Sequence, residues 1–321
     1  MIHPKKISVV FSVYNEAESL GHLFDQLQKL FSQTIHHFEI LFVDDGSTDQ
    51  SAEIIRSFMA SLHAGVHSCR LIRFSRNFGH EAAMIAGMDH ASGDAVICMD
   101  ADLQHPLEMI PGMTDQFVQG YEVVSMVRKE NKGVSPLAHA MSRFFYRMLN
   151  LMSSDKLHYN ASDFFLVSAN VASVLRNNYR ERTRFLRGII QTIGFKSTSL
   201  EYVAPPRISG TTKYSLPGLL ALTAHAVTSF SKAPLYLGIW FGFIFAALSI
   251  VLAIYTMWVY LFGAAPPSGY TTIVLFLSIS FSILFFLIGI IGIYVGHLFE
   301  EQKGRPIYLV EEIDFSGSPS C

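Results

Sequence analysis

The chain has 321 residues, which is enough for one domain of about 200–230 residues and a smaller second part. Half of the residues are hydrophobic and only 16% are charged, a composition that is apolar for a soluble enzyme and indicates a membrane part. The formal net charge of −2 argues against a nucleic-acid partner, and 3 scattered cysteines are too few for a disulfide framework or a zinc site.

Each of the first four predicted strands ends in polar residues. The apolar runs at 7–13, 38–43, 71–74 and 96–99 are typical of strands, and the first begins so early that we expect no signal peptide. The polar residues at the strand ends are, in chain order, Tyr14, Glu16, Asp44, Asp45, Arg76, Asp100 and Asp102. Because ligands of open α/β sheets bind at the carboxyl ends of the strands, we expect these side chains to line one site.

The second of these strand ends predicts a nucleotide contact. Asp44 and Asp45 stand where a carboxylate can accept hydrogen bonds from a ribose hydroxyl or a base N–H. Ser47 and Gln50 fit a capping box for a helix predicted at about 49–62. The alternative is that Asp45 only caps this helix.

The pair Asp100 and Asp102 is the most informative signal. Two carboxylates one residue apart repel each other unless a cation lies between them. Oxygen ligands of this kind suit Mg²⁺ or Mn²⁺, which keeps open positions for substrate phosphates. The alternative is a turn whose acids face solvent. His105, just before Pro106, is interpreted as a turn residue rather than a metal ligand.

These motifs together resemble one enzyme family. The resemblance is carried by residues 13–16, 44–49, 75–79, 100–106, 181–188, 207–214 and 303–306, and thus by nearly the whole chain. They are similar to the inverting family 2 glycosyltransferases, more narrowly to the polyisoprenyl-phosphate group of dolichol-phosphate mannose synthase and the bacterial GtrB-type enzymes. The fold class implied is α/β, with a GT-A Rossmann-like nucleotide-sugar domain over residues 1–214.

Two long uncharged segments predict a membrane anchor. Residues 235–262 and 271–296 contain no charged residue, and each exceeds the roughly 20 apolar residues that span a hydrocarbon core. Positive charges flank the pair on one side, at Lys232, Lys303 and Arg305, so the catalytic domain and both termini are expected in the cytoplasm. The alternative is a pair of buried core helices.

The predicted organisation therefore has four parts. They are the catalytic domain at 1–214, juxtamembrane interfacial helices at 215–233, two transmembrane helices within 234–300, and a cytoplasmic C-terminal tail at 301–321. For the juxtamembrane segment, an ordinary core helix is the competing interpretation.

The resemblance implies inverting transfer of one sugar from a nucleotide-diphosphate sugar to polyprenyl phosphate. UDP-glucose or UDP-N-acetylglucosamine is the preferred donor, with GDP-mannose behind. A phosphate monoester has a second pKa of about 6, so it is already a nucleophile at neutral pH. The site must therefore supply cations for two anionic substrates rather than a general base. A metal on Asp100 and Asp102 would act as a Lewis acid toward the diphosphate.

Basic residues are accordingly the expected ligands of the acceptor phosphate. The candidates are Arg128, Arg143, Arg207, Lys213 and Tyr214, of which Arg128 closes a strand predicted at 122–127. Arg128 is also expected among the catalytic residues, with Asp100, Asp102 and Asp163. For Arg143, Arg182 and Arg207, a solvated surface charge is an equal alternative.

Two departures from the family pattern are present. Related enzymes usually carry Asp-Phe-Arg-Leu where this chain has Asp163-Phe164-Phe165-Leu166, so a cation expected near the acceptor is missing. Asp163 remains to orient the sugar or a neighbouring cation, with a structural turn acid as the alternative. Ser12 stands where a proline is common.

The resemblance also implies partners and a location. It implies a bacterial plasma membrane, a separate flippase, and an outer-face glycosyltransferase that builds cell-envelope glycans. A two-helix anchor also invites self-association. A processive polysaccharide synthase is a rival, but it usually has a Gln-x-x-Arg-Trp element and more spans. A catalytically silent scaffold that binds nucleotide sugars is the other rival; the acidic pair argues against it, and Phe165 keeps it open.

Overall fold

The computed structural model describes residues 5–62, 68–129, 161–181, 185–205, 233–262 and 269–316. These residues form two units. The first contains the described residues up to 205 together with 305–316, and the second contains those from 233 to 304. Nearly all of the predicted interfacial segment 215–233 lies outside the described residues.

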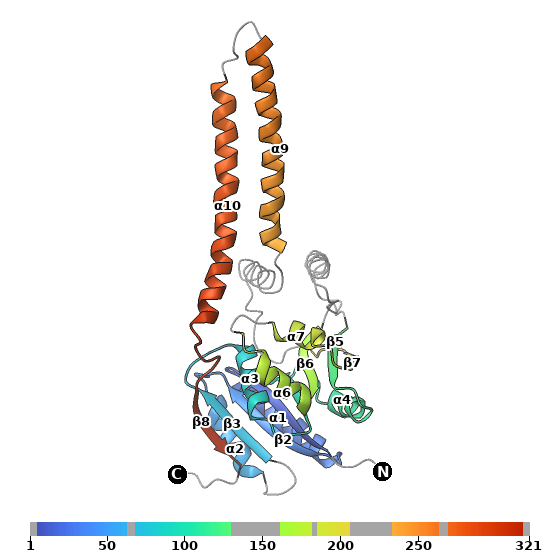
Figure 1. Ribbon diagram of the computed structural model, residues 1–321. Coiled ribbons are helices and arrows are strands. Elements are labelled where there is room, and N and C mark those ends of the chain that lie inside the picture. The colour runs from blue at the N-terminus through green and yellow to red at the C-terminus, as the bar shows by residue number, and fades with distance from the viewer. Residues whose placement is uncertain are drawn as a thin grey trace. The chain divides into compact units, whose positions relative to one another are not determined.

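The first unit is built on one mixed sheet (Figure 1). Within the described residues the strand order is β7-β5-β6-β4-β1-β2-β3-β8. The strands are β1 (Lys6–Val13), β2 (His37–Asp44), β3 (Ser68–Phe74), β4 (Ala95–Asp100), β5 (Val123–Arg128), β6 (Ala161–Ser168), β7 (Ser197–Tyr202) and β8 (Val310–Phe315). Strands β1 to β4 are parallel, whereas β6 runs antiparallel to both β4 and β5. The predicted α/β class is confirmed, and the first five predicted strands correspond to β1–β5.

Helices cover both faces of this sheet. They are α1 (Ala17–Ser32), α2 (Ser51–Ser61), α3 (His80–His90), α4 (Met109–Val118), α6 (Ala169–Asn178) and α7 (Leu186–Thr192). Helices α1, α2 and α4 share a core with Ile7, Val9 and Phe11 of β1. Successive strand residues face opposite sides, and α3 packs on Val10 from the other face. This packing is so close that a Cβ atom at Gly87 would lie 2.0 Å from Cγ1 of Val10.

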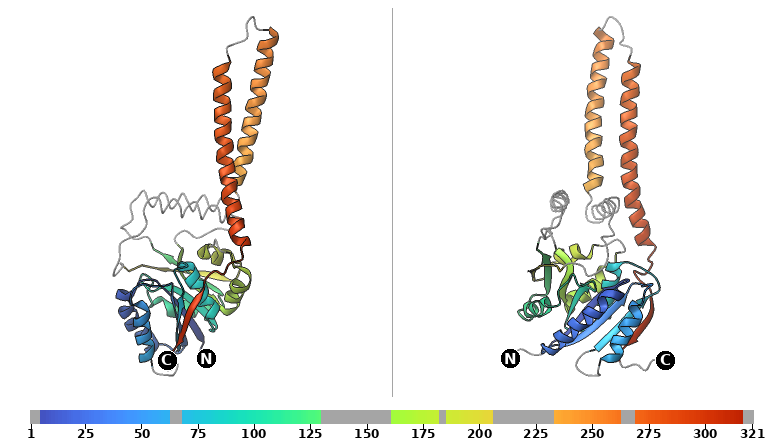
Figure 2. Two further views of the ribbon diagram at one scale, coloured as in Figure 1. Left: turned by 90° about the vertical axis from the view of Figure 1, so that its left-hand side faces the viewer. Right: turned by 180° about the vertical axis from the view of Figure 1, so that it is seen from behind.

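The segment after residue 304 returns to the sheet of the first unit. Strand β8 pairs antiparallel with β3, and the two lie side by side in Figures 1 and 2. The ring of Tyr308 stacks on that of Phe74 with a centroid distance of 5.1 Å. The hydroxyl of Tyr308 donates to Oδ2 of Asp89 at 2.8 Å. Arg56 forms an ion pair with Glu312 of β8 at 2.6 Å. Part of the predicted C-terminal tail is therefore an edge strand, which the sequence analysis did not anticipate.

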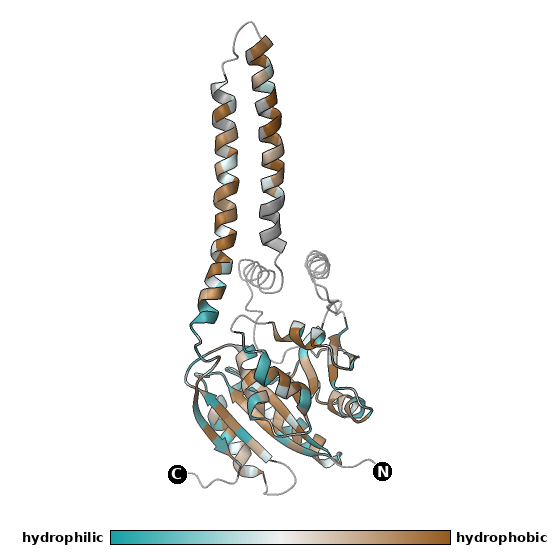
Figure 3. Cartoon of the chain, viewed as in Figure 1, coloured by the Kyte–Doolittle hydropathy of each residue, from teal (hydrophilic) through white to brown (hydrophobic). Residues whose placement is uncertain are grey.

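The described part of the second unit consists of α9 (Ala233–Phe262) and α10 (Tyr270–Gln302). Hydrophobic residues predominate along the parts of both helices that Figure 3 colours by hydropathy. The ring centroids of Phe245 and Phe276 are 6.2 Å apart, so the helices lie side by side. Among the described residues, one stretch, Ile279–Gln302, is long and apolar enough to cross a membrane.

Candidate active site

A cleft of about 780 Å³ lies at the carboxyl edge of the sheet, and residues from both halves of the sheet line it. Because β6 is antiparallel to β4 and β5, its amino end reaches the same edge as their carboxyl ends. The predicted site residues that line the cleft are Tyr14, Glu16, Asp45, Asp100, Asp102, Arg128 and Asp163. The fold thus brings together most of the described residues that the sequence singled out.

The loop after β4 is held in a strained conformation. The backbone N–H of Asp100 donates to Nδ1 of His105 at 3.0 Å, and the N–H of Gln104 donates to Oδ1 of Asp102 at 3.0 Å. Between them, Leu103 has a φ of 62°, a left-handed conformation that is unusual for a leucine. Residues held in such conformations cluster at functional sites, where the surrounding structure enforces them.

His105 is a structural part of this loop. Only 4% of its surface is exposed, and its ring stacks on Phe164 with a centroid distance of 5.1 Å. Burial lowers the pKa of His105, so the neutral form is favoured. Because Nδ1 accepts a hydrogen bond from the backbone of Asp100, that nitrogen is engaged within the loop, in agreement with a turn residue.

His80, the first residue of α3, lies between two carboxylates. Its Nδ1 is 3.0 Å from Oγ of Ser12 and 3.2 Å from Oδ1 of Asp100, and its Nε2 is 3.9 Å from Oδ2 of Asp163. Burial alone would lower the pKa of His80, but Asp100 and Asp163 outweigh it and raise the pKa above its usual value. Sequence reasoning did not single out His80, although it directly follows the glycine of the 75–79 motif.

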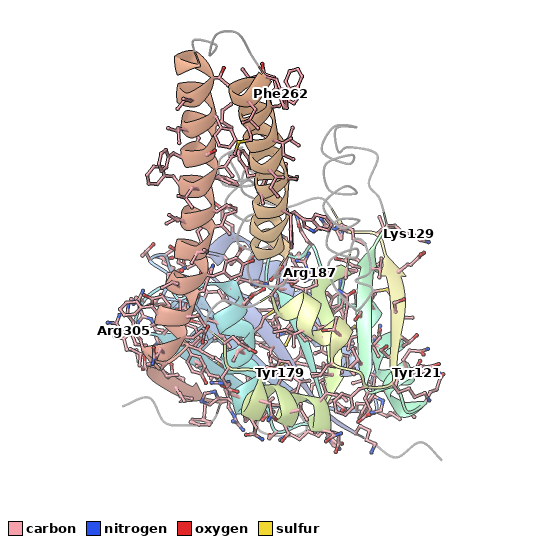
Figure 4. The ribbon with its side chains drawn as sticks, turned by 45° about the horizontal axis from the view of Figure 1, so that its top comes forward. Tyr121, Lys129, Tyr179, Arg187, Phe262 and Arg305 are labelled. Carbon is pink, nitrogen blue, oxygen red and sulfur yellow. The ribbon has the colours of Figure 1, made fainter. Side chains whose placement is uncertain are left out.

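Asp163 is paired with an arginine that the sequence analysis did not select. Arg187 lies on α7 (Figure 4), and its Nε donates to Oδ1 of Asp163 at 3.1 Å while Nη2 donates to Oδ2. Burial would raise the pKa of Asp163, but the guanidinium of Arg187 lowers it below the usual value. Asp163 is therefore an ionised carboxylate within the cleft. The available signal was that Arg187 belongs to the 181–188 motif.

Arg128, the last residue of β5, is hydrogen-bonded to the loop after β4 that carries Asp102. Its Nη2 donates to Oε1 of Gln104 at 2.9 Å. Its Nε is buried and has no hydrogen-bond partner among the described residues. Arg128 also lines the cleft, where its guanidinium can interact with an anionic ligand.

The carboxylate of Asp45 links the loop after β2 to the loop after β3 by hydrogen bonds. Its two carboxylate oxygens accept hydrogen bonds from the backbone N–H groups of Phe78 at 2.6 Å and Gly79 at 2.9 Å. Burial raises the pKa of Asp45 above its usual value. Gly46 makes this close approach possible, because it has a φ of 70° and a Cβ there would lie 2.6 Å from the carbonyl carbon of Arg76.

The predicted capping box at the start of α2 is wrong. Helix α2 begins after Gln50, whose side chain makes no capping hydrogen bond, and Oδ1 of Asp49 accepts from the N–H of Ser51 at 3.0 Å. The hydroxyl of Ser47 instead accepts a hydrogen bond from the backbone N–H of Asn15 at 2.9 Å. Asp44 is fully buried beneath this turn, and its Oδ1 accepts from the N–H of Ser47 at 2.9 Å.

The remaining predicted residues lie elsewhere. Among the described residues, Asp44 and Arg76 do not line the cleft. The guanidinium of Arg76 lies over the ring of Phe78, 4.3 Å from its centroid. The predicted cations and tyrosine outside the described residues are Arg143, Arg182, Arg207, Lys213 and Tyr214. Phe165, which stands where related enzymes carry an arginine, lies in β6 and is 1% exposed, and it is not among the described residues that line the cleft.

The acidic pair fits a cation whose coordination a substrate completes. In the described part of the chain, no three histidine, cysteine or acidic side chains are arranged to hold a metal ion. Asp100 and Asp102 nevertheless bring carboxylate oxygens from one loop into one cleft. Mg²⁺ is typically held by one or two carboxylates together with substrate phosphates, so two protein ligands are sufficient.

Comparison with known proteins identifies the family. The sequence profile described as Glycosyl transferase family 2 matches residues 8–176. The chain is 35% identical over 306 residues to the uncharacterized glycosyltransferase YkcC of Bacillus subtilis, covering 95% of this chain and 93% of that protein. It is 33% identical over 312 residues to the prophage bactoprenol glucosyl transferase homolog of Escherichia coli, covering 96% of this chain and 99% of that protein. It is 32% identical over 307 residues to the bactoprenol glucosyl transferase of Shigella phage SfII, covering 96% and 98%. The chain therefore belongs to glycosyl transferase family 2, and the protein is a glycosyltransferase.

Proposed function

We propose that the protein transfers one sugar, with inversion, from a nucleotide-diphosphate sugar to polyprenyl phosphate at a membrane. The observation that carries this proposal is the nearly full-length similarity to proteins named bactoprenol glucosyl transferases. By that analogy UDP-glucose is the preferred donor and UDP-N-acetylglucosamine the next. A GDP-mannose-dependent enzyme with the same acceptor is the alternative.

Each part of the cleft receives a role in this reaction. Tyr14, Glu16 and Asp45 contact the nucleotide sugar from the β1–β2 side, where Asp44 shapes the turn. Asp100 and Asp102 hold Mg²⁺ or Mn²⁺. When bound, such an ion neutralises the charge that develops on the departing diphosphate.

The acceptor requires cations rather than a base. A phosphate monoester is largely dianionic at neutral pH and attacks the anomeric carbon without losing a proton. Arg128 lines the cleft, and its guanidinium is suited to hold this phosphate. Arg143, Arg207, Lys213 and Tyr214 are proposed to complete that contact. Asp163 is proposed to keep a neighbouring cation in position.

The membrane part is proposed to bring the acceptor to this cleft. Helices α9 and α10 would form two transmembrane spans, with the catalytic unit and both termini in the cytoplasm. In a bacterial plasma membrane, a separate flippase and an outer-face glycosyltransferase would then use the lipid-linked sugar for cell-envelope glycans. Self-association of the protein through its anchor is part of the same proposal.

A transfer assay tests the reaction and the donor together. Purified protein is incubated with undecaprenyl phosphate, Mg²⁺ or Mn²⁺, and a panel of radiolabelled nucleotide sugars. We expect label from UDP-glucose in the organic phase, and none when undecaprenol replaces its phosphate. Absence of transfer from every donor, with the nucleotide still bound, would favour a silent scaffold and contradict the proposal.

A further inference from the structure

We infer that Arg187, oriented by Asp163, binds the phosphate of the lipid acceptor. This inference rests on the proposed function and names a contact within it. Arg187 lines the cleft, and its side chain is 28% exposed, so it is packed yet accessible from the cleft.

Arg187 lies on the same half of the cleft as Arg128, the proposed ligand of the acceptor phosphate. Strand β4, which ends in the acidic pair, separates the cleft into two halves. The β1–β2 half presents Tyr14, Glu16 and Asp45. Among the described residues of the cleft, both arginines are on the other half, Arg128 on β5 and Arg187 on α7, which contacts β6.

The charge of the cleft favours a fixed cation beside the phosphate. The carboxylates that line it are Glu16, Asp45, Asp100, Asp102 and Asp163. A dianionic phosphate that enters among these acids is repelled unless fixed positive groups lie beside it. Arg128 and Arg187 are the arginines that the described part of the cleft offers.

The geometry of the pair is suited to a ligand contact. Two of the five N–H groups of Arg187 donate to Asp163 in a forked arrangement, which fixes the plane of the guanidinium. A guanidinium held in this way loses little conformational freedom when it binds a phosphate. Asp163 thus acts as a positioning residue, and Arg187 makes the contact.

A second arginine–aspartate pair in the same unit serves as a comparison. Nη1 of Arg180 donates to both carboxylate oxygens of Asp89, at 3.0 and 2.9 Å. Asp89 also accepts from the hydroxyl of Tyr308, so this pair holds the C-terminal segment on the sheet. Neither Arg180 nor Asp89 is among the described residues that line the cleft. Arg180→Gln is therefore the matched control for Arg187→Gln.

Steady-state kinetics with each substrate varied in turn test the inference. For Arg187→Gln we expect the KM for undecaprenyl phosphate to rise on the order of tenfold to a hundredfold, with the KM for the nucleotide sugar unchanged. Arg187→Lys should show a smaller rise, because it keeps the charge and loses the fork. Arg180→Gln should leave both KM values unchanged. A rise in the donor KM alone would assign Arg187 to the diphosphate and overturn the inference, as would a fall in kcat with both KM values unchanged.

A binding measurement covers the case in which Arg187→Gln does not fold. Wild-type protein and Arg187→Lys are titrated with a short-chain polyprenyl phosphate and with the matching alcohol. We expect the wild type to prefer the phosphate and the variant to show a weaker preference for it; an equal preference in both proteins would overturn the inference. If wild-type protein transfers no sugar but shows this difference, the proposed function fails and the phosphate contact stands.

Discussion

Strand β2 carries a buried carboxylate near each end, and the two carboxylates differ in how completely their oxygens are hydrogen-bonded. Near its amino end, Glu39 is fully buried, and its carboxylate accepts hydrogen bonds from both Oγ and the backbone N–H of Ser92, at 2.6 and 2.8 Å, and from Nη2 of Arg70 at 2.9 Å. At its carboxyl end, Asp44 is equally buried, yet in the part of the chain that the structure describes its Oδ2 has no hydrogen-bond partner. Nε of Arg73 lies 3.5 Å from that oxygen.

The same contrast extends along both edges of the sheet. At the amino edge, Glu39, Ser8 and Ser92 form a hydrogen-bonded network. The carboxyl edge carries positive φ angles at Asn15 and Leu103 and an unpaired Nε at Arg128 among the described residues. Strain and unsatisfied polar groups are tolerated where a ligand will use them. The buried charge of Glu39 is thus paired at the amino edge, whereas backbone strain and unpaired polar atoms of the described residues lie at the edge that carries the cleft.

The largest expected effect is a loss of activity when an aspartate just after the carboxyl end of β4 is replaced. Asp102→Asn should lower the rate of sugar transfer on the order of a thousandfold or more, because the neutral amide is a poor ligand for a divalent ion. The control is Asp94→Asn at the amino end of the same strand, where the carboxylate accepts from the backbone N–H of Lys6 at 3.0 Å. Asp94→Asn should keep the wild-type rate per folded molecule. Equal losses in both variants would remove the distinction between the two edges.

The next largest effect is expected on the free energy of unfolding, when the buried carboxylate of Glu39 is replaced. Glu39→Gln should lower the free energy of unfolding of the catalytic unit by about 3 kcal/mol at pH 7, because Arg70 is left without its buried partner. The rate of transfer by folded protein should not change. Denaturant titrations of both proteins measure the difference.

The pH dependence of that difference gives a second test. Burial would raise the pKa of Glu39, but hydrogen bonds from Ser8 and Ser92 and the charge of Arg70 outweigh it and lower the pKa. A lowered folded-state pKa contributes stability above the unfolded value of about 4.3, and this contribution is lost as pH falls through the folded value. The gap between wild type and Glu39→Gln should therefore narrow on acidification. A gap that stays constant with pH would contradict this account.

Substitutions of two glycines test the same difference between the two sheet edges, with smaller expected effects on stability. A Cβ at Gly46 would meet the backbone of Arg76 at 2.6 Å, and one at Gly93, on the amino edge, would meet the backbone N of Ser8 at 2.7 Å. Alanine at either position should cost about 2 kcal/mol of stability. Only Gly46→Ala should also raise the KM for the nucleotide sugar, because it displaces the loop that Asp45 holds. A raised donor KM in Gly93→Ala would argue against the separation of roles.

The smallest effect concerns backbone strain at Asn15. Its φ is 56°, and its Oδ1 accepts from the N–H of Thr48 at 2.8 Å. Asn15→Gly removes the strain and the hydrogen bond together, so its stability should stay within about 0.5 kcal/mol of wild type. Asn15→Ala keeps the strain and loses the bond, so it should cost about 1 kcal/mol. Equal stabilities of the two variants would mean that no strain is stored there.

The strand ends of the first half of the sheet could be predicted from sequence because their signals are local. Each apolar run stops at a polar residue, and the parallel arrangement then places Asp45, Asp100 and Asp102 at one edge. What escaped prediction depends on distant parts of the chain. Arg187 reaches Asp163 only because β6 is antiparallel and α7 packs on it.

The remaining misses have the same physical cause. Strand β8 pairs with a strand more than 200 positions away, and its short acidic sequence carries little strand signal of its own. The hydroxyl of Ser47 was expected to cap α2, but the backbone of Asn15 competes successfully for it. Local patterns therefore predicted most of the described cleft residues that the sequence singled out, whereas tertiary contacts decided which partner each side chain takes.

Sensitivity of sugar transfer to chelation is the most direct test of the role given to the acidic pair. Full-length protein is dialysed against a strong chelator and assayed with UDP-glucose and undecaprenyl phosphate, before and after Mg²⁺ or Mn²⁺ is restored. The account predicts loss of transfer in the chelator and recovery on addition of either ion in the wild type, but not in Asp102→Asn. Undiminished transfer by metal-free protein would contradict it.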